Sequence, residues 1–163
     1  MRGAKPIRVE VSVHVDDSED PPQSEKLRQK IISELILRVL EEERISRGQL
    51  DLVFCGDGRI TELNETWFGR EGPTDVIAFN LSDDPDSTDT VEGEIYIDLA
   101  QAERQAAEFG ATFDEEVCRL IIHGVLHLVG YDDASGPEEA EQMTNRQEYY
   151  VAGWGKPVLK GGR

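Results

Sequence analysis

Several kinds of residue are scarce in this chain, and each shortage excludes a class of protein. Only two of the 163 residues are cysteines, Cys55 and Cys118, and they lack the paired spacing of a disulfide framework. No apolar run approaches the roughly 20 residues that a membrane-spanning helix needs. Residues 1–15 mix charges with single valines, unlike a signal peptide. We therefore expect a protein of the reducing cytoplasm.

Basic residues are also few. Lysine and arginine total 17 against 34 aspartates and glutamates, which gives a formal net charge of -17. The simplest nucleic-acid binders neutralise phosphates with basic patches, so this balance argues against that class. A nucleic-acid enzyme of this charge would need local basic residues, a metal ion, or a partner that carries much of the recognition.

The residues that are present fit one globular α+β domain over residues 1–163, with 38% hydrophobic and 31% charged residues. Alternating and helical hydrophobic periodicity predicts a small mixed four-stranded sheet packed by about five helices. The predicted strands are residues 8–15, 50–55, 76–79 and 91–97. The predicted helices start near residues 27, 57, 99, 113 and 137. Residues 82–90 predict a mobile surface loop, and the basic, glycine-rich residues 155–163 predict a flexible tail.

One stretch, residues 123–133, carries metal-ligating side chains at a spacing with a mechanical reason. His123 and His127 are four residues apart, so on a helix they advance by roughly 400° and leave the same face about one turn apart. Thr112 and Glu115 have the spacing of a capping box at the start of this helix. After Arg119 the two histidines are the only polar side chains of this segment, so we expect a buried helix. The third histidine, His14, lies on the polar face of the first predicted strand, where we expect it to be exposed and without function.

Gly130 and two aspartates follow the second histidine. Gly130 favours a left-handed helix cap that stops the helix and lets the backbone double back. Asp132 and Asp133 come next, and Asp133 is the better candidate for a third ligand because of its reach. Two imidazoles and one carboxylate leave zinc an open fourth position, which is typical of a catalytic site.

Two other readings compete with a catalytic metal site. In the first, His123 and His127 are core histidines that hydrogen-bond internally, and the aspartates only cap a turn. In the second, the helix is that of a metalloprotease, whose ligand spacing is the same. Metalloproteases carry a glutamate general base directly after the first histidine, whereas this chain has Gly124 there.

The sequence resembles the YbeY family of bacterial ribosomal-RNA maturation endoribonucleases. The resemblance rests on three blocks, which are residues 63–64 with 73–79, residues 93–95, and residues 123–133, and it spans the chain from about residue 60 to residue 150. The family pattern His-Gly-x-Leu-His-Leu-x-Gly-Tyr-Asp-His is matched at every fixed position except the last.

Three positions depart from the family. The family's third metal ligand is usually histidine, and here that position is Asp133, whose oxygen binds zinc at about the same distance as an imidazole nitrogen. An arginine that matters for RNA cleavage commonly follows the aromatic residue after Leu-Asn, and here that position is Phe68, with Arg70 two residues later. A serine often found before the phenylalanine of the first block is replaced by Ala78.

The resemblance implies a metal-dependent endoribonuclease that cleaves single-stranded RNA in small-subunit ribosomal-RNA maturation and ribosome quality control. The chemistry of the residues agrees, because a metal-bound water or an activated ribose 2′-hydroxyl can attack a phosphodiester while the ion stabilises the developing charge. We expect one zinc per chain on His123, His127 and Asp133. Asp132 is expected to support the site or act as a base, and Arg70 to contact the phosphate.

Two further functions stay open. One is zinc-dependent hydrolysis of a peptide or a small molecule. The other is a non-catalytic ribosome-binding factor whose metal only staples the last helix to the sheet, an alternative that Phe68 keeps open. The expected partners are ribosomal RNA and the small ribosomal subunit, with ribosomal proteins or GTPases as candidates to supply positive charge, and no membrane.

Overall fold

The predicted strands pair into one mixed sheet with the order β1-β2-β4-β3. The computed structural model describes residues 6–84 and 86–162. β1 runs parallel to β2 and β2 parallel to β4, whereas β3 pairs antiparallel with β4 at the sheet edge. The strands are β1 (Arg8–Val15), β2 (Arg47–Cys55), β3 (Val76–Asn80) and β4 (Thr90–Asp98).

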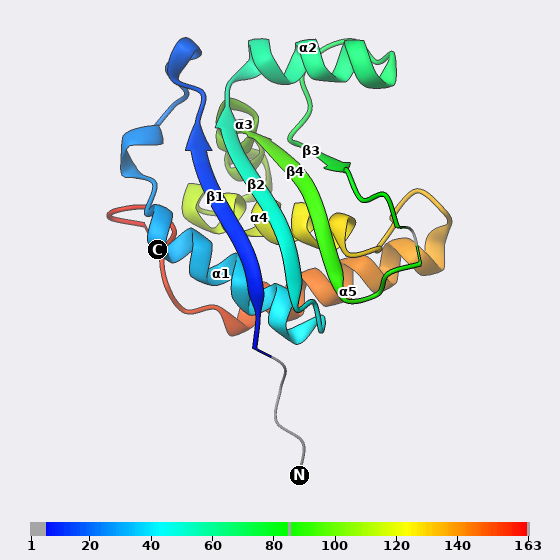
Figure 1. Cartoon of the computed structure of the whole chain (residues 1–163). Helices are drawn as coiled ribbons and strands as arrows, with labels where there is room; N and C mark the ends of the chain where they lie inside the picture. Colours follow the sequence, from blue (N-terminus) through cyan, green and yellow to red (C-terminus); the bar gives the residue numbers. More distant parts are fainter. Residues whose placement is uncertain (1–5, 85, 163) are drawn as a thin grey trace.

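Five α-helices lie in the described part of the chain, as the periodicity predicts. α1, α3 and α4 cover one face of the sheet, and α5 packs against α4 (Figure 1). The single α+β domain with a four-stranded mixed sheet is therefore confirmed. The helices are α1 (Gln29–Glu42), α2 (Asp57–Phe68), α3 (Leu99–Phe109), α4 (Phe113–Leu128) and α5 (Pro137–Gly153).

The two faces of the sheet differ because the strands alternate. Val13, Leu52 and Ile95 lie in register on the face that packs against the helices. The opposite face, here called the open face, carries polar residues, including an exposed row of Glu10, Gln49 and Glu92. α2 covers only the end of the open face, over a small cluster of Cys55, Ile60 and Ile77 (Figure 1). His14 lies exposed on the open face, as predicted.

α4 packs so closely on the sheet that glycine is required at two contacts. A Cβ atom on Gly124 would lie 2.6 Å from Ile95 Cγ2 in β4, and a Cβ atom on Gly93 would lie 2.6 Å from Leu128 Cδ2 in α4. The two glycines therefore set the distance between α4 and β4. The helix that carries both histidines is fixed against the middle of the sheet.

A flexible tail was predicted over residues 155–163, and over the described part, residues 155–162, that prediction was wrong. Residue 163 lies outside the described residues. Val158 and Leu159 are buried, and Leu159 forms an antiparallel bridge with Leu27. The backbone N–H of Leu159 also donates to Asp114 Oδ2 at 2.9 Å. This pairing uses the chain before α1, which is why the helix begins after Leu27 rather than at it.

The remaining structural predictions concern the cysteines and the membrane. Cys55 and Cys118 are buried free thiols. No helix in the described part of the chain has the length and apolar character to cross a membrane.

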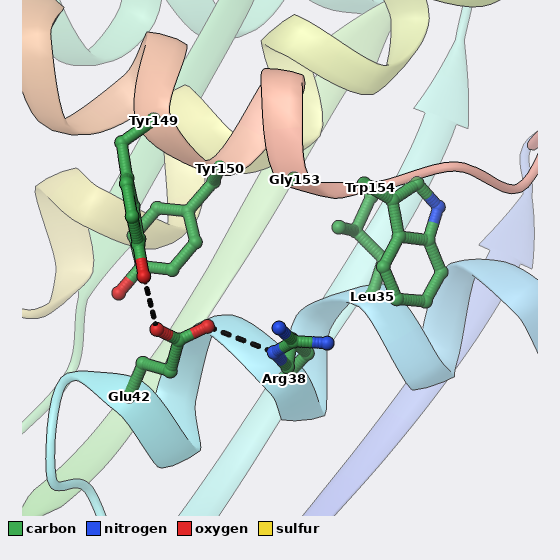
Figure 2. A pocket seen from close by; sticks show the side chains of 7 residues that line it. All are labelled: Leu35, Arg38, Glu42, Tyr149, Tyr150, Gly153 and Trp154. Carbon is green, nitrogen blue, oxygen red and sulfur yellow. Dashed lines mark hydrogen bonds and ion pairs between the residues drawn. The ribbon is translucent and has the colours of Figure 1, made fainter.

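At the far end of α5, Glu42 of α1 accepts hydrogen bonds from Arg38 Nε and from the Tyr149 hydroxyl, both at 2.8 Å, which ties α1 to α5 (Figure 2).

Candidate metal centre

The two histidines are the accessible stripe of a helix that is otherwise buried. α4 starts at the predicted cap, where Thr112 Oγ1 accepts a hydrogen bond from the Glu115 backbone N–H at 3.1 Å. From residue 120 to residue 128 every residue is buried except His123 and His127, which are partly exposed. These two side chains are therefore accessible at the surface of the helix, as an ion-binding role requires.

Gly130 reverses the chain directly after α4. It has a φ of +114°, which L side chains rarely adopt. Its N–H donates to the His127 carbonyl at 3.2 Å, and the Tyr131 N–H donates to the Leu126 carbonyl at 3.0 Å, which is the Schellman pattern of helix ends. The predicted glycine stop therefore forms, and it returns the next residues toward the helix.

Asp132 holds the turn that delivers Asp133. One Asp132 oxygen accepts from the Ala134 N–H at 2.8 Å, and the other accepts from the Ser135 hydroxyl. The hydrogen bond from Ser135 lowers the pKa of Asp132 most, and the hydrogen bond from the Ala134 N–H lowers it further. These contacts support the metal site through the backbone and make Asp132 a weak proton acceptor.

The side chains of His123, His127 and Asp133 converge. The two Nε2 atoms are 3.1 Å apart, and Asp133 carboxylate oxygens lie 3.5 Å from His123 Nε2 and 3.6 Å from His127 Nε2. One ligand atom from each residue lies within 4.8 Å of the others. Ligands held about 2.0–2.1 Å from a tetrahedral zinc lie about 3.3 Å from one another, so the three residues fit a zinc-sized ion.

Gln147 of α5 fixes the ring of His123. Its Nε2 donates to Glu148 Oε2 at 3.2 Å, so its Oε1 is the acceptor that faces His123 Nδ1 at 2.6 Å. Nδ1 of His123 therefore carries the proton, which leaves the Nε2 lone pair directed at the site. Burial lowers the pKa of His127, and the neighbouring His123 lowers it further, so the imidazole is kept neutral as a ligand must be.

A cleft opens beside the candidate ligands. His127 and Asp133 contribute to its lining, as do Phe68 and Arg70, which flank Gly69 at the C-terminal end of α2. Asn64 is buried and donates from Nδ2 to the Gly72 carbonyl at 3.0 Å, which holds the loop that carries Arg70. Of the predicted site residues, Arg70, His127, Asp132 and Asp133 line this cleft. His123 does not line it, but its Nε2 atom lies beside His127 and Asp133, which do.

The peptidase alternative loses its general base for a structural reason. Gly124 stands at the position of the metalloprotease glutamate, and a Cβ atom added there would point at Ile95 rather than into the cleft. Even a glutamate placed there would meet β4. The site therefore has metal-ligating residues without the usual peptidase base.

The sequence reasoning missed the contributions of Gln147 and Asn64. Gln147 lies 24 residues beyond His123 on another helix, and nothing in the amphipathic pattern of α5 marks it. Asn64 carried a weak signal, since a buried asparagine near the end of a predicted helix needs a partner for its amide.

Comparisons with known proteins identify relatives of this chain. A family model described as Endoribonuclease YbeY matches residues 13–155. A protein of Persephonella marina named Endoribonuclease YbeY is 34% identical over 123 residues, which cover 75% of this chain and 80% of that protein. A protein of Halalkalibacterium halodurans with the same name is 31% identical over 156 residues, covering 89% and 98%. A Thermotoga maritima protein with a solution structure is similar with a TM-score of 0.58 and 28% identity over 86% of each chain.

Proposed function

Because the chain belongs to the YbeY family of endoribonucleases, we propose that it cleaves single-stranded RNA in a metal-dependent reaction. The proposed role is maturation of small-subunit ribosomal RNA and quality control of ribosomes. The observation that carries the proposal is the convergence of His123, His127 and Asp133 beside a cleft that also holds Arg70.

We assign one zinc per chain to the metal centre. His123 and His127 would bind through Nε2 and Asp133 through a carboxylate oxygen, with Gln147 fixing the ring of His123. Zinc in such a site activates water as a nucleophile at neutral pH and stabilises negative charge on phosphoryl oxygens. The partly exposed ligands leave room for substrate at the same position.

The protein's own groups orient the RNA. Arg70 is exposed on the cleft wall, and no ion pair involves its guanidinium in the described part of the chain, so it is available to a phosphate. Asp132 serves the reaction by holding the turn that presents Asp133. Arg70 is thus proposed to contact the phosphate, and Asp132 to support the turn rather than to act as a general base.

The cellular setting follows from the substrate. Ribosomal RNA and the small ribosomal subunit are the proposed partners, which places the activity in the cytoplasm. A protein with a net charge of -17 meets RNA against electrostatic repulsion. Ribosomal proteins or a GTPase that contribute positive charge are therefore part of the proposal.

Elemental analysis of wild type, His127→Ala and Asp133→Ala tests the metal assignment. We expect about one zinc per chain in the wild type and loss of it in both variants, because two ligands hold a zinc poorly. His14→Ala is the matched control, since it removes an exposed histidine from the open face and should retain the metal. Wild-type chains that take up no zinc when it is supplied would overturn the assignment.

Cleavage of labelled single-stranded and duplex ribosomal-RNA fragments by the same proteins tests the activity. We expect the wild type and His14→Ala to cut the single strand and the two ligand variants to lose at least about a hundredfold in rate, as for loss of a metal that stabilises the transition state. Zinc-loaded protein that ignores RNA but cuts a peptide panel would favour the other hydrolase. Unchanged RNA processing in a metal-free variant would favour the structural-metal alternative.

A further inference from the structure

We propose that Phe68 is a stacking platform for one unpaired RNA base, placed beside the metal centre. This inference rests on the proposed function and names how the cleft selects its substrate. Phe68 is a large aromatic side chain that is 48% exposed. An aromatic ring exposed in a polar cleft is available to bind a ligand.

The ring of Phe68 is held rigidly on one face. It stacks on Phe79 of β3 with ring centroids 5.9 Å apart and an interplanar angle of 20°. Phe79 is itself fixed by edge contacts with Trp67 and Tyr96, each at 5.9 Å. No second ring stacks on Phe68 among the described residues. A base that stacked on its free face would continue an aromatic pile that already exists.

The position of Phe68 matches the shape of a nucleotide. Gly69 adopts a φ of +63° and turns the chain, so that Phe68 and Arg70 line the same cleft two residues apart. A nucleotide presents a phosphate and a base at separate points on one sugar. Arg70 is suited to the phosphate and Phe68 to the base, and His127 and Asp133 line the same cleft.

The chemistry of the cleft favours an unpaired base over an apolar protein segment. Its lining includes polar side chains, such as Asn64, Thr74 and Asn80, beside the single exposed ring. Every base has a π-face, so stacking on an aromatic ring tolerates sequence but requires that the base is free of a duplex. The cleft would therefore select single strands without reading their sequence.

The pocket between α1 and α5 is a useful contrast. Its charged and hydroxyl groups satisfy one another, since Arg38 and Tyr149 both donate to Glu42 (Figure 2). No comparable pairing occupies Arg70 or Phe68 within the described residues. The cleft at the metal centre is thus the one of the two that offers unmatched groups to a ligand.

The experiment measures binding of a labelled single-stranded RNA of about ten nucleotides, a length typical of one single-strand binding site. Metal-loaded protein is used at low temperature, with the strand checked for cleavage by gel electrophoresis, and the titration is repeated after chelation. Phe68→Ala is compared with Phe68→Trp and with Phe109→Ala. Phe109 is the matched control, because it is a phenylalanine that is 65% exposed at the end of α3 and does not line the cleft.

We expect Phe68→Ala to weaken binding by about 5-fold to 100-fold, as for the loss of one base–aromatic stack. Phe68→Trp should retain affinity, and Phe109→Ala should stay within about twofold of wild type. A strand with an abasic site scanned along it provides a test that leaves the protein unchanged. One abasic position should cost the wild type as much as Phe68→Ala does, and should cost Phe68→Ala nothing more.

The outcomes separate this inference from the proposed function. If the wild type binds and cleaves RNA while Phe68→Ala does so equally well, only the platform is wrong. Affinity lost in Phe68→Ala without coupling to any abasic position also overturns the platform, because the ring then affects RNA binding without stacking on one base. If the wild type neither binds nor cleaves single-stranded RNA, the proposed function fails together with it.

Discussion

At the scale of single residues, Asp98 is the most unusual carboxyl group outside the metal centre. Its side chain is fully buried at the start of α3, where Oδ1 accepts from the Ala100 N–H at 3.0 Å and Oδ2 has no donor among the described residues. Its neighbour Asp57 is held by Arg104 at 2.7 and 3.1 Å. Burial, together with Asp57, raises the pKa of Asp98 to about 7. A proton on Asp98 Oδ2 lets this carboxyl group donate a hydrogen bond to Asp57.

This raised pKa predicts the direction of a stability change with pH. In the folded protein Asp98 keeps a proton up to about pH 7, whereas the unfolded chain releases it near the ordinary value of 3.8. The free energy of unfolding should therefore fall as pH rises from about 4 to 7 and then level off. Asp98→Asn keeps the cap and supplies a permanent N–H for Asp57, so it should lack this decline and exceed wild type in stability at pH 8.

Urea denaturation at several pH values from 5 to 8 measures the difference between wild type and Asp98→Asn. Asp51→Asn, on the open face, is the control for removal of one carboxylate and should keep the wild-type decline. If the free energy of unfolding falls equally with pH in wild type and in Asp98→Asn, Asp98 does not keep a proton up to about pH 7. Asp57 does not blur the result, because its hydrogen bonds with Arg104 lower its pKa and move its own effect to more acidic solution.

The residues that could be predicted are those whose geometry is local. His123 and His127 share a face because helix geometry fixes it, and Asp133 follows a glycine turn that the sequence also marks. Gln147 and the ring pile under Phe68 depend on contacts between elements far apart in the chain. No periodicity encodes such contacts, so they appear only in the folded structure.

At the scale of elements, the contact of α4 with β4 is the one that positions the metal ligands. Gly124→Ala should push the added methyl group against Ile95, where the unrelaxed distance is 2.6 Å. Overpacking of this kind costs about 1–3 kcal/mol, which exceeds the gain of about 1 kcal/mol that alanine brings to a helix. We expect Gly124→Ala to lower the free energy of unfolding and to weaken metal retention.

Urea denaturation and metal analysis check this expectation. Gly153→Ala in α5 is the matched control, since nothing lies within 4 Å of its added Cβ and it should be neutral or slightly stabilising. If Gly124→Ala is as stable as Gly153→Ala, the close contact does not set the position of α4.

Element boundaries were predictable where the sequence carries a local stop or cap. The cap at Thr112 and the stop at Gly130 both form as expected. The end of the chain was not predictable, because a basic, glycine-rich composition is typical of a frayed tail. The bridge between Leu27 and Leu159 spans nearly the whole sequence, and local composition carries no sign of it.

At the scale of the whole molecule, negative charge predominates. Carboxylates of Glu10, Asp51, Glu92 and Glu94 all lie on the open face, and the net charge is -17. Long-range repulsion between two polyanions slows their encounter, and salt screens it over about 10 Å at 0.1 M. Salt should therefore raise the association rate with RNA, which is opposite to the behaviour of basic RNA binders.

Stopped-flow mixing of labelled single-stranded RNA with the protein, at ionic strengths from about 0.02 to 0.2 M, measures this rate. A variant with Glu10→Gln, Asp51→Asn and Glu92→Gln should associate faster at low salt and show a smaller salt effect. Association that slows with added salt in the wild type would mean that local positive charge in the cleft outweighs the net charge.

The two tryptophans give the chain a further property. Trp67 of α2 is 66% exposed, whereas Trp154 lies beside Leu35 of α1 with its indole nitrogen buried (Figure 2). An indole in water fluoresces at longer wavelength than one in apolar surroundings, so the native protein carries two optical reporters of different colour. Changes at the red side of the spectrum report on α2 beside the cleft, and changes at the blue side report release of the C-terminal segment. Ligand binding and unfolding can thus be followed separately in one sample without an attached dye.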